Sequence, residues 1–344
     1  MEILDKVLNG FLTNSTDYII QPFGTGLIHK TFIVEKNNEK MFVLQQINTN
    51  VFKWPDHISF NIHNLSDHLI SIGSTTILPR PLKTISGMDY MENDGVLYRL
   101  MPFIKDTHSI DVCASPDQAY EAAKQFGNLT ASFNHFNTDS LKTTIQDFHN
   151  LSFRWNKFTH AIKNGNPKRI EQCKSEINAL ISDYRLVEFY ENAVRSGWLN
   201  ARVTHHDTKI SNVLFDSMDK GVCVIDLDTV MSGYFISDLG DMFRTYLSSA
   251  NEEEQDVQMV IAREDYLKAI LEGYKEKMAD LMSDIESQNI LYAGEFMIYM
   301  QALRFLTDYL NNDVYYSIHY ETNNLTRTLN QLALLKSYRS IISL

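Results

Sequence analysis

The feature that most limits what this chain can fold into is a pair of short apolar runs inside a half that is otherwise helical in character. The runs, 212–216 and 222–226, flank the turn-like segment 217–221, and this pattern predicts a β-hairpin. Paired symmetrically about the turn, the hairpin would place Asn212 opposite Asp226. Side chains opposed in this way have Cβ atoms roughly 4.5–5.5 Å apart. The sequence therefore predicts an amide and a carboxylate held side by side.

Before residue 105 the chain favours β-structure. Two runs rich in β-branched and aromatic residues, 30–35 and 41–47, flank a polar turn, which predicts a second hairpin. Another strand is expected at 96–100, just before a proline. These strands predict a small antiparallel β-sheet lobe over residues 1–104, with a hinge near 101–104.

After residue 104 amphipathic helices dominate. Ser115 is an N-cap followed by proline at the first helical position, and apolar residues then recur at helical spacing. We expect an α+β, bilobal, protein-kinase-like fold in which residues 105–344 form the larger, mostly helical lobe with the β-hairpin embedded in it. Further helices are expected near 171–195, 251–275, 289–310 and 324–342.

The embedded hairpin carries the groups that magnesium-dependent phosphoryl transfer from ATP requires. The spacing H-x-D-x-K-x-x-N comprises His205, Asp207, Lys209 and Asn212, and Asp226 ends the second apolar run. In such a set one carboxylate accepts the proton of the attacking hydroxyl, and a lysine meets the charge of the moving phosphoryl group. We therefore predict that the hairpin is catalytic, with Asp207 and Lys209 as its catalytic residues.

Oxygen ligands of this kind suit magnesium better than zinc. We expect Asn212 and Asp226 to share one ion, and Asp228 to reach the same face because strand side chains alternate. An ordinary polar turn, or a zinc site built from the His-His-Asp triplet at 205–207, are the alternatives. Adjacent residues rarely converge on one ion, and no nearby cysteine or histidine completes a tetrahedron.

If a nucleotide binds here, the sheet lobe should carry a loop that covers its phosphates. The segment Gly24-Thr25-Gly26 fits, because glycine lets backbone amides approach phosphate oxygens. The next strand lacks the expected lysine and presents Gln45, which supplies a hydrogen bond but no charge. Adenine recognition is expected at backbone groups near Met101 and Phe103.

Composition excludes several classes of partner. The formal net charge of −12 leaves no basic stripe for nucleic acid. The three cysteines are widely spaced and form no C-x-x-C pair, which suits a reducing cytoplasm. No apolar run approaches the roughly 18 residues that span a membrane, and the N-terminus lacks the pattern of a signal peptide. We expect a cytoplasmic protein whose partners are a nucleotide and a small molecule.

The motifs resemble those of the aminoglycoside phosphotransferase and choline kinase superfamily. H-x-D-x-x-x-x-N at 205–212, I-D-x-D at 225–228 and S-D-L-G-D at 237–241 are similar to its signature. More narrowly, the chain resembles the N-acetylhexosamine 1-kinases, which phosphorylate the anomeric hydroxyl of N-acetylglucosamine or N-acetylgalactosamine. This closer likeness spans nearly the whole chain and includes glutamine in place of the strand lysine. It rests on the segments 44–53, 206–215, 304–310 and 314–316.

The resemblance implies ATP as co-substrate, Mg2+ as cofactor and an amino sugar as acceptor. It assigns the role of base to Asp207 and a phosphoryl or sugar contact to Lys209. It assigns magnesium binding to Asn212 and Asp226, with Asp228 assisting.

The same resemblance implies supporting roles for other residues. Arg304 and Tyr315 match positions where that family touches the sugar. His205 is expected to anchor the catalytic loop through hydrogen bonds, and the aspartates of 237–241 to brace it. Arg304 could instead pair with Asp308 four residues on, a solvated pair worth about 0.3–0.5 kcal/mol.

Two other functions stay open at this point. A kinase of the same superfamily acting on an aminoglycoside, choline or homoserine is the first, and a cationic acceptor would need clustered acids such as Asp308, Asp313 and Glu321 or aromatic rings. A catalytically silent pseudokinase or sugar-binding regulator is the second, because the sheet lobe lacks its lysine.

Overall fold

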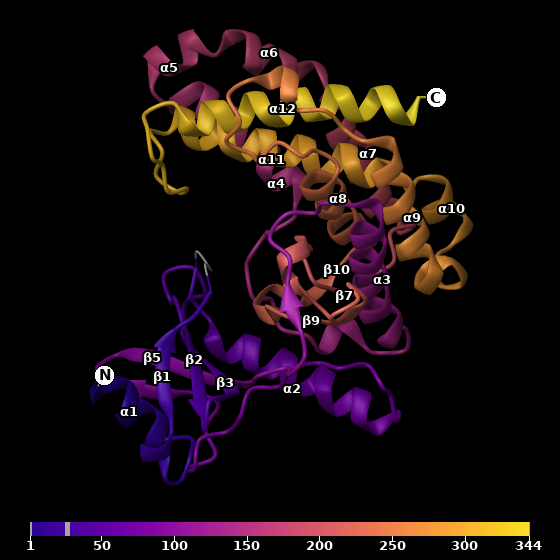
Figure 1. The fold of residues 1–344 in the computed structure, drawn as a ribbon. Coiled ribbons are helices and arrows are strands. Elements are labelled where there is room, and N and C mark those ends of the chain that lie inside the picture. The colour runs from indigo at the N-terminus through magenta and orange to yellow at the C-terminus, as the bar shows by residue number, and fades with distance from the viewer. Residues whose placement is uncertain (1, 25–27, 344) are drawn as a thin grey trace.

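A computed structural model of the chain describes residues 2–24 and 28–343. Its first part is a five-stranded sheet with strand order β1-β2-β3-β5-β4, and every neighbouring pair is antiparallel (Figure 1). The predicted α+β fold with a small antiparallel sheet is thereby confirmed. The strands are β1 Ile19–Pro22, β2 Lys30–Lys36, β3 Glu39–Gln46, β4 Met91–Asn93 and β5 Val96–Pro102.

A tight turn joins β2 to β3. Asn37 and Asn38 both have positive φ, 54° and 62°, as a two-residue hairpin turn of the mirror-image type requires. Asparagine tolerates this left-handed conformation better than most residues do. The strands therefore run closer to the turn than the predicted runs 30–35 and 41–47.

The two faces of the sheet have different partners. Helix α1 (Glu2–Asn9) covers one face, where its apolar side chains are buried against Leu44 and Leu100. Because side chains alternate along a strand, the neighbouring Gln45 and Arg99 point to the opposite face. That face carries the contacts with the helical lobe.

Helix α2 (Pro55–Ser71) lies between the two lobes (Figure 1). Its buried Ile58 and Ile62 belong to the apolar core of the helical lobe. The side chain of Asn61 donates hydrogen bonds to the carbonyls of Lys142 and Val230, at 2.7 and 2.9 Å. This helix therefore packs on the second lobe, although it precedes residue 104 in sequence.

The second part of the chain is mostly helical around one continuous apolar core. Helix α11 (Tyr292–Leu310), nearly all of whose side chains are buried, packs against α8 (Phe235–Tyr246) and α12 (Asn323–Ile342) (Figure 1). The remaining helices are α3 Pro116–Ser132, α4 Leu151–Asn164, α5 Pro167–Gln172, α6 Lys174–Ser182, α7 Arg185–Ser196, α9 Glu264–Met278 and α10 Asp284–Gln288.

Two predicted helices, 289–310 and 324–342, are confirmed as α11 and α12. The predicted helix 251–275 begins only with α9. Upstream of it, asparagine and aspartate side chains in 251–256 accept backbone N–H groups two residues on, which favours turns over helix. The predicted helix 171–195 is divided among α5, α6 and α7, and no described helix is both long and apolar enough to cross a bilayer.

The embedded hairpin is present, but its predicted register is wrong by one residue. Strand β8 (Val213–Phe215) pairs with β9 (Gly221–Val224), and the N–H of Ile225 donates to the carbonyl of Asn212 at 2.8 Å. Asn212 therefore lies opposite Ile225 rather than Asp226. Pairing is irregular within β8, so the strands are not symmetric about the turn. Three more short strands complete this region: β6 His108–Ser109 beside β8, and β7 Arg202–Thr204 paired with β10 Met231–Gly233.

Gly240 of α8 lies where α8 and α11 approach most closely. A Cβ at this position would lie 2.3 Å from the carbonyl oxygen of Ala293 and 2.8 Å from the Cβ of Met297. We therefore expect Gly240→Ala to lower the free energy of unfolding by about 1–3 kcal/mol, because neither helix can move without losing core contacts. Urea denaturation measures the change, with exposed Ser175→Ala on α6 as control. A Gly240→Ala variant as stable as that control would contradict the close approach.

Candidate active site

The loop that follows β7, predicted to be catalytic, is held by two carboxylates of α8. Asp238 accepts the backbone N–H groups of His205 and His206 at 2.9 and 2.7 Å. Asp241 accepts the N–H of Thr208 at 2.8 Å. Hydrogen bonds to ionised groups are roughly twice as strong as neutral ones. The aspartates of this helix thus brace the loop backbone, which is the role that the sequence predicts for them.

His205 links this loop to the end of the hairpin. Its ring is buried, and Nδ1 accepts the N–H of Asp207 at 3.3 Å. The hydrogen therefore resides on Nε2, which donates to the carbonyl of Ile225 at 3.0 Å. The hydroxyl of Thr229 donates to the His205 carbonyl at 2.6 Å. Because both ring nitrogens are engaged, His205 acts as an anchor.

The structure brings Asp207, Lys209 and Asn212 together. The ammonium of Lys209 lies 3.1 Å from Oδ2 of Asp207. The amide nitrogen of Asn212 donates to that same oxygen at 3.1 Å and to the Asp207 carbonyl at 2.8 Å. Burial alone would lower the pKa of Lys209, but the carboxylates of Asp207 and Asp226 raise it, so the lysine stays charged. Among the described residues, none donates a hydrogen bond to the other carboxylate oxygen of Asp207 or to the amide oxygen of Asn212, so both oxygens could bind ligands.

Asp226 and Asp228 do not share a strand face as predicted. Strand β9 ends before them, Asp226 has a positive φ of 59°, and Asp228 lies in the short 3-10 turn η4 (Leu227–Thr229). Asp228 is fully buried, and its oxygens bind the Arg99 guanidinium and, at 2.7 Å, Nε2 of His29. The geometric argument for Asp228 as a magnesium ligand is therefore wrong, because both of its oxygens already have partners in the sheet lobe.

Asp226 fits the requirements of a magnesium ligand better. No hydrogen bond to its carboxylate is formed by the described side chains, and burial together with Asp228 and Asp207 raises its pKa. A cation placed beside it would relieve this repulsion. The described residues include no group of three His, Cys, Asp or Glu side chains able to hold a metal alone. Magnesium typically takes one or two protein carboxylates and completes its shell with phosphate and water, which suits Asp226 and the free oxygen of Asn212.

On the sheet lobe, Gly24 has a φ of +76°, a conformation that glycine adopts without strain. Thr25 and Gly26, the other residues predicted to cover the phosphates, lie outside the described residues. Gln45 faces the helical lobe, and its amide oxygen accepts a hydrogen bond from Nε of Arg99 at 2.9 Å. A buried cation therefore lies beside the position of the missing lysine.

The predicted hinge, 101–104, begins in the last two residues of β5, Val96–Pro102. The N–H of Phe103 donates to the carbonyl of Met41 at 3.0 Å, so it is not free to bind a base. The Phe103 ring packs edge-on against Phe23, with 6.4 Å between ring centroids. Recognition of a base by backbone groups near Met101 remains a prediction, and it would have to use groups other than the Phe103 amide.

Arg304 of α11 lies among aromatic rings. Its guanidinium carbon is 5.5 Å from the ring centres of Phe148 and Tyr316 and 5.9 Å from that of Tyr315. The alternative pairing with Asp308 is wrong, because the Asp308 carboxylate accepts the backbone N–H groups of residues 314–316 at 2.8–3.0 Å. Arg304 itself donates to the side-chain oxygen of Gln301 at 3.0 Å.

Sequence reasoning missed three further residues beside Arg304. His149 Nδ1, Arg154 Nε and the Tyr316 hydroxyl are buried without a hydrogen-bond partner among the described residues. Burial and the charge of Arg304 lower the pKa of Arg154 to about 10. The His149 ring lies 5.3 Å from that of His206, next to the predicted base. These groups lie on α4 and on loops without a motif, so no spacing in the sequence joins them.

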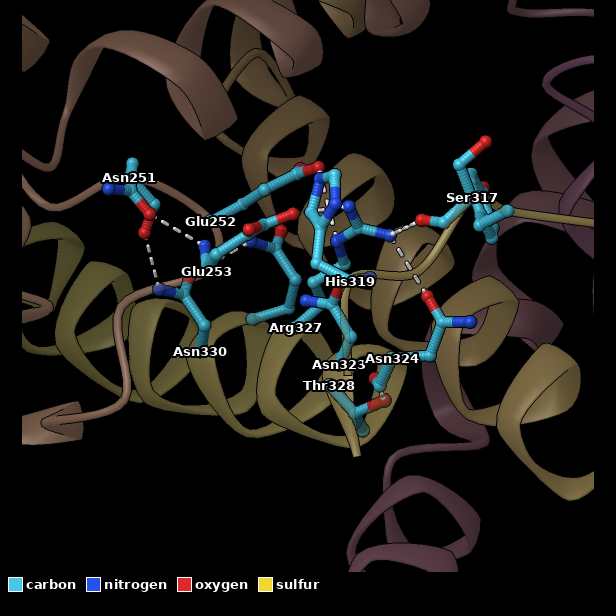
Figure 2. Close-up of polar contacts among 12 residues, drawn as sticks. Asn251, Glu252, Glu253, Ser317, His319, Asn323, Asn324, Arg327, Thr328 and Asn330 are labelled. Atoms are coloured by element: carbon cyan, nitrogen blue, oxygen red, sulfur yellow. Dashed lines mark hydrogen bonds and ion pairs between the residues drawn. The ribbon is translucent and has the colours of Figure 1, made fainter. Parts of the chain in front are cut away.

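The loop between α11 and α12, which carries Tyr315, is tied to α12 by Arg327 (Figure 2). Arg327 donates to the carbonyl of Ser317 at 3.2 Å and to the side chain of Asn324 at 3.1 Å, and it pairs with Glu253. Figure 2 shows its guanidinium between the acidic segment around Glu253 and the Ser317 backbone. The loop that presents Tyr315 to Arg304 is therefore fixed at both of its ends, since Asp308 holds its start.

Comparison with known proteins places this geometry in context. Residues 19–276 match the family described as "Phosphotransferase enzyme family". An aminoglycoside phosphotransferase from Alicyclobacillus acidocaldarius has a similar structure, with a TM-score of 0.66 and 14% identity over 98% of this chain and 96% of the other. A microcompartment-associated aminopropanol kinase gives 0.63 and 15% over 98% and 97%. A choline kinase from Cryptosporidium parvum gives 0.62 and 12% over 99% and 96%.

The burial of the His206 side chain can be tested through the pH dependence of the free energy of unfolding. Burial lowers its pKa from 6.5 to about 4, so the unfolded chain takes up the proton first as the pH falls. Its contribution of about 3 kcal/mol to the free energy of unfolding is complete above pH 6.5 and is lost between pH 6.5 and about 4. His206→Asn, which tolerates the φ of 68° at this position, should therefore gain stability relative to wild type as the pH falls through that window.

Urea denaturation at a series of pH values measures this slope. The exposed His160→Asn serves as control and should keep the wild-type slope. Equal slopes for wild type and His206→Asn would show that folding does not lower the pKa of the His206 ring.

Proposed function

Because this chain belongs to the phosphotransferase enzyme family, we propose that it transfers the γ-phosphoryl group of Mg-ATP to the anomeric 1-hydroxyl of an N-acetylhexosamine. The observation that carries this proposal is a set of buried polar atoms near Arg304 that have no hydrogen-bond partner among the described residues. One of them belongs to His149, whose ring lies 5.3 Å from that of His206, the residue before Asp207. Such a set matches an acceptor rich in hydroxyl and amide oxygens. The resemblance to N-acetylhexosamine 1-kinases in the same segments supports it.

The catalytic side of the mechanism uses groups whose positions are fixed. Asp207 orients the acceptor hydroxyl and removes its proton, and the α8 tethers hold the loop so that no reorganisation is needed. Lys209, kept charged by its carboxylate neighbours, stabilises charge on the transferred phosphoryl oxygens. Magnesium, when bound at Asn212 and Asp226, would neutralise phosphate charge. An anomeric hydroxyl is more acidic than an ordinary alcohol, so the demand on Asp207 is modest.

The residues around Arg304, where we place the acceptor, disfavour a cationic substrate. The guanidinium group of Arg304 already lies near the aromatic rings of Phe148 and Tyr316, which could otherwise surround an ammonium group. Asp308 is committed to backbone N–H groups, and Asp313 pairs with Arg169 at 2.5 Å. Two guanidinium groups without a carboxylate partner among the described residues, those of Arg154 and Arg304, would repel a positive charge. Choline and aminoglycosides are therefore disfavoured, and neutral sugars are favoured.

The first prediction from this proposed function concerns the acceptor. In an assay of ADP release with Mg-ATP, N-acetylglucosamine and N-acetylgalactosamine should react, and their 1-methyl glycosides should not, because the anomeric hydroxyl is blocked. Choline and aminoglycosides should give no ADP above background. Turnover of a 1-methyl glycoside at the rate of the free sugar would overturn the proposed position of transfer.

The second prediction concerns the base. Asp207→Asn should reduce kcat by about a hundredfold to ten-thousandfold, the range typical of a lost general base. The matched control is Asp280→Asn, which changes an exposed aspartate and should leave kcat unaltered. A folded Asp207→Asn enzyme with near-full activity would remove this residue from the mechanism.

The third prediction concerns Arg154. Arg154→Gln removes a charged hydrogen-bond donor worth about 1.5–3 kcal/mol, so the KM for the sugar should rise about tenfold to a hundredfold while the KM for ATP stays constant. Lys157→Gln, an exposed cation on the same helix, is the control and should change neither constant. If both KM values rise together for Arg154→Gln, the residue does not contact the acceptor.

A further inference from the structure

A row of three side chains crosses one face of the sheet lobe. The strand register places Thr31 opposite Gln45, and Gln45 opposite Arg99. Nε of Arg99 donates to the Gln45 amide oxygen at 2.9 Å, and the Gln45 amide nitrogen donates to the Thr31 hydroxyl at 3.5 Å. The guanidinium group therefore lies one strand away from the position where the missing lysine was expected.

The partner of this guanidinium belongs to the other lobe. Arg99 is 2% exposed and Asp228 is 0% exposed, and they form an ion pair. Removing one member of a buried pair leaves the other charge uncompensated, which is strongly unfavourable.

Asp228 also binds a second element of the sheet lobe. Its Oδ2 lies 2.7 Å from Nε2 of His29, the residue just before β2. The N–H of Asn48 donates to Nδ1 of the same ring at 3.1 Å. Nε2 therefore carries the hydrogen and donates it to the carboxylate. One carboxylate of the helical lobe thus holds both β5 and the start of β2.

Asp228 is only two positions along the chain from Asp226, the candidate magnesium ligand. Asp226 and Asp228 belong to one tight turn, in which Asp226 has positive φ. A shift of Asp228 toward or away from the sheet would therefore change the direction of the Asp226 carboxylate. The position of Asp226 relative to the sheet depends on the ion pair with Arg99.

We infer that Arg99 on β5 is the cation with which the sheet lobe, although it lacks a β3 lysine, holds Asp228, and through it Asp226, in the arrangement that binds Mg-nucleotide. The inference rests on the proposed Mg-ATP site. Arg99 is a positioning residue, since it is buried behind Asp228 and acts through that side chain.

The test moves the positive charge from position 99 on β5 to position 45 on β3. We compare wild type, Arg99→Gln and the double variant Arg99→Gln/Gln45→Lys, measuring MgADP binding by calorimetry without any acceptor. Arg99→Gln should weaken MgADP binding about tenfold to a hundredfold, as expected for the loss of a charged hydrogen bond. The double variant should recover at least about tenfold, because a lysine on β3 has its Cβ roughly 4.5–5.5 Å from that of residue 99 and shares its face.

The control variant is Arg80→Gln, which removes an arginine of the sheet lobe paired with the exposed Asp67. It should bind MgADP as wild type does. Binding of ADP without magnesium is measured in parallel, and it should change less than MgADP binding in Arg99→Gln, because the effect passes through Asp226. A purely structural role would weaken both forms of the nucleotide equally.

Each outcome decides between the two proposals. If wild type fails to bind MgADP, the nucleotide site and the inference fall together. If wild type binds and Arg99→Gln binds equally well, the inference is wrong while the proposed function stands. If Arg99→Gln does not fold, the double variant must fold and bind MgADP. A double variant that is unfolded, or folded and no tighter than Arg99→Gln, refutes the role of the strand cation.

Discussion

The active-site geometry depends on the hydrogen bonds that Asp238 and Asp241 accept from the backbone of the catalytic loop. Without them, the left-handed residue His206, with a φ of 68°, would have little to hold it, since strained backbone persists only where its surroundings determine it. These carboxylates are buried at a cost: burial raises the pKa of Asp238 to about 6, although the loop N–H groups and His205 counteract this. Helix α8 can deliver them only because Gly240 lets it approach α11. Packing of two helices thereby fixes the position of the proposed base.

Much of this framework is predictable from local sequence. The β2–β3 hairpin, the helices α11 and α12, and the loop that gathers Asp207, Lys209 and Asn212 follow from periodicity and spacing, because each is specified by residues close together in the chain. The predicted register of the embedded hairpin was wrong by one residue. The irregular pairing within β8 that causes the difference leaves no signal in the composition. Asp228 was predicted to be a metal ligand because strand alternation was extended beyond residue 224, where β9 ends and Asp226 is left-handed.

The parts that could not be predicted are contacts between distant segments. Arg99 and Asp228 are 129 positions apart, and no periodicity connects a strand of one lobe to a turn of the other. The region around Arg304 is similar, because His149, Arg154 and Tyr316 come from a loop, α4 and a second loop. Their common property is visible only in three dimensions: each has a buried donor or acceptor atom that the described residues do not satisfy. Unsatisfied buried polar groups are unfavourable unless a ligand completes them, so this region is where a substrate is expected.

We propose that Asp207, on a loop held by α8, and the unsatisfied buried groups near Arg304 direct the phosphoryl group of ATP to one hydroxyl of an amino sugar. Phosphorus NMR of the product formed from Mg-ATP and N-acetylglucosamine distinguishes the hydroxyl that is phosphorylated. We expect a single phosphate ester whose phosphorus couples to the anomeric proton and which is labile in mild acid. A phosphate on any other hydroxyl, or release of inorganic phosphate alone, would contradict it.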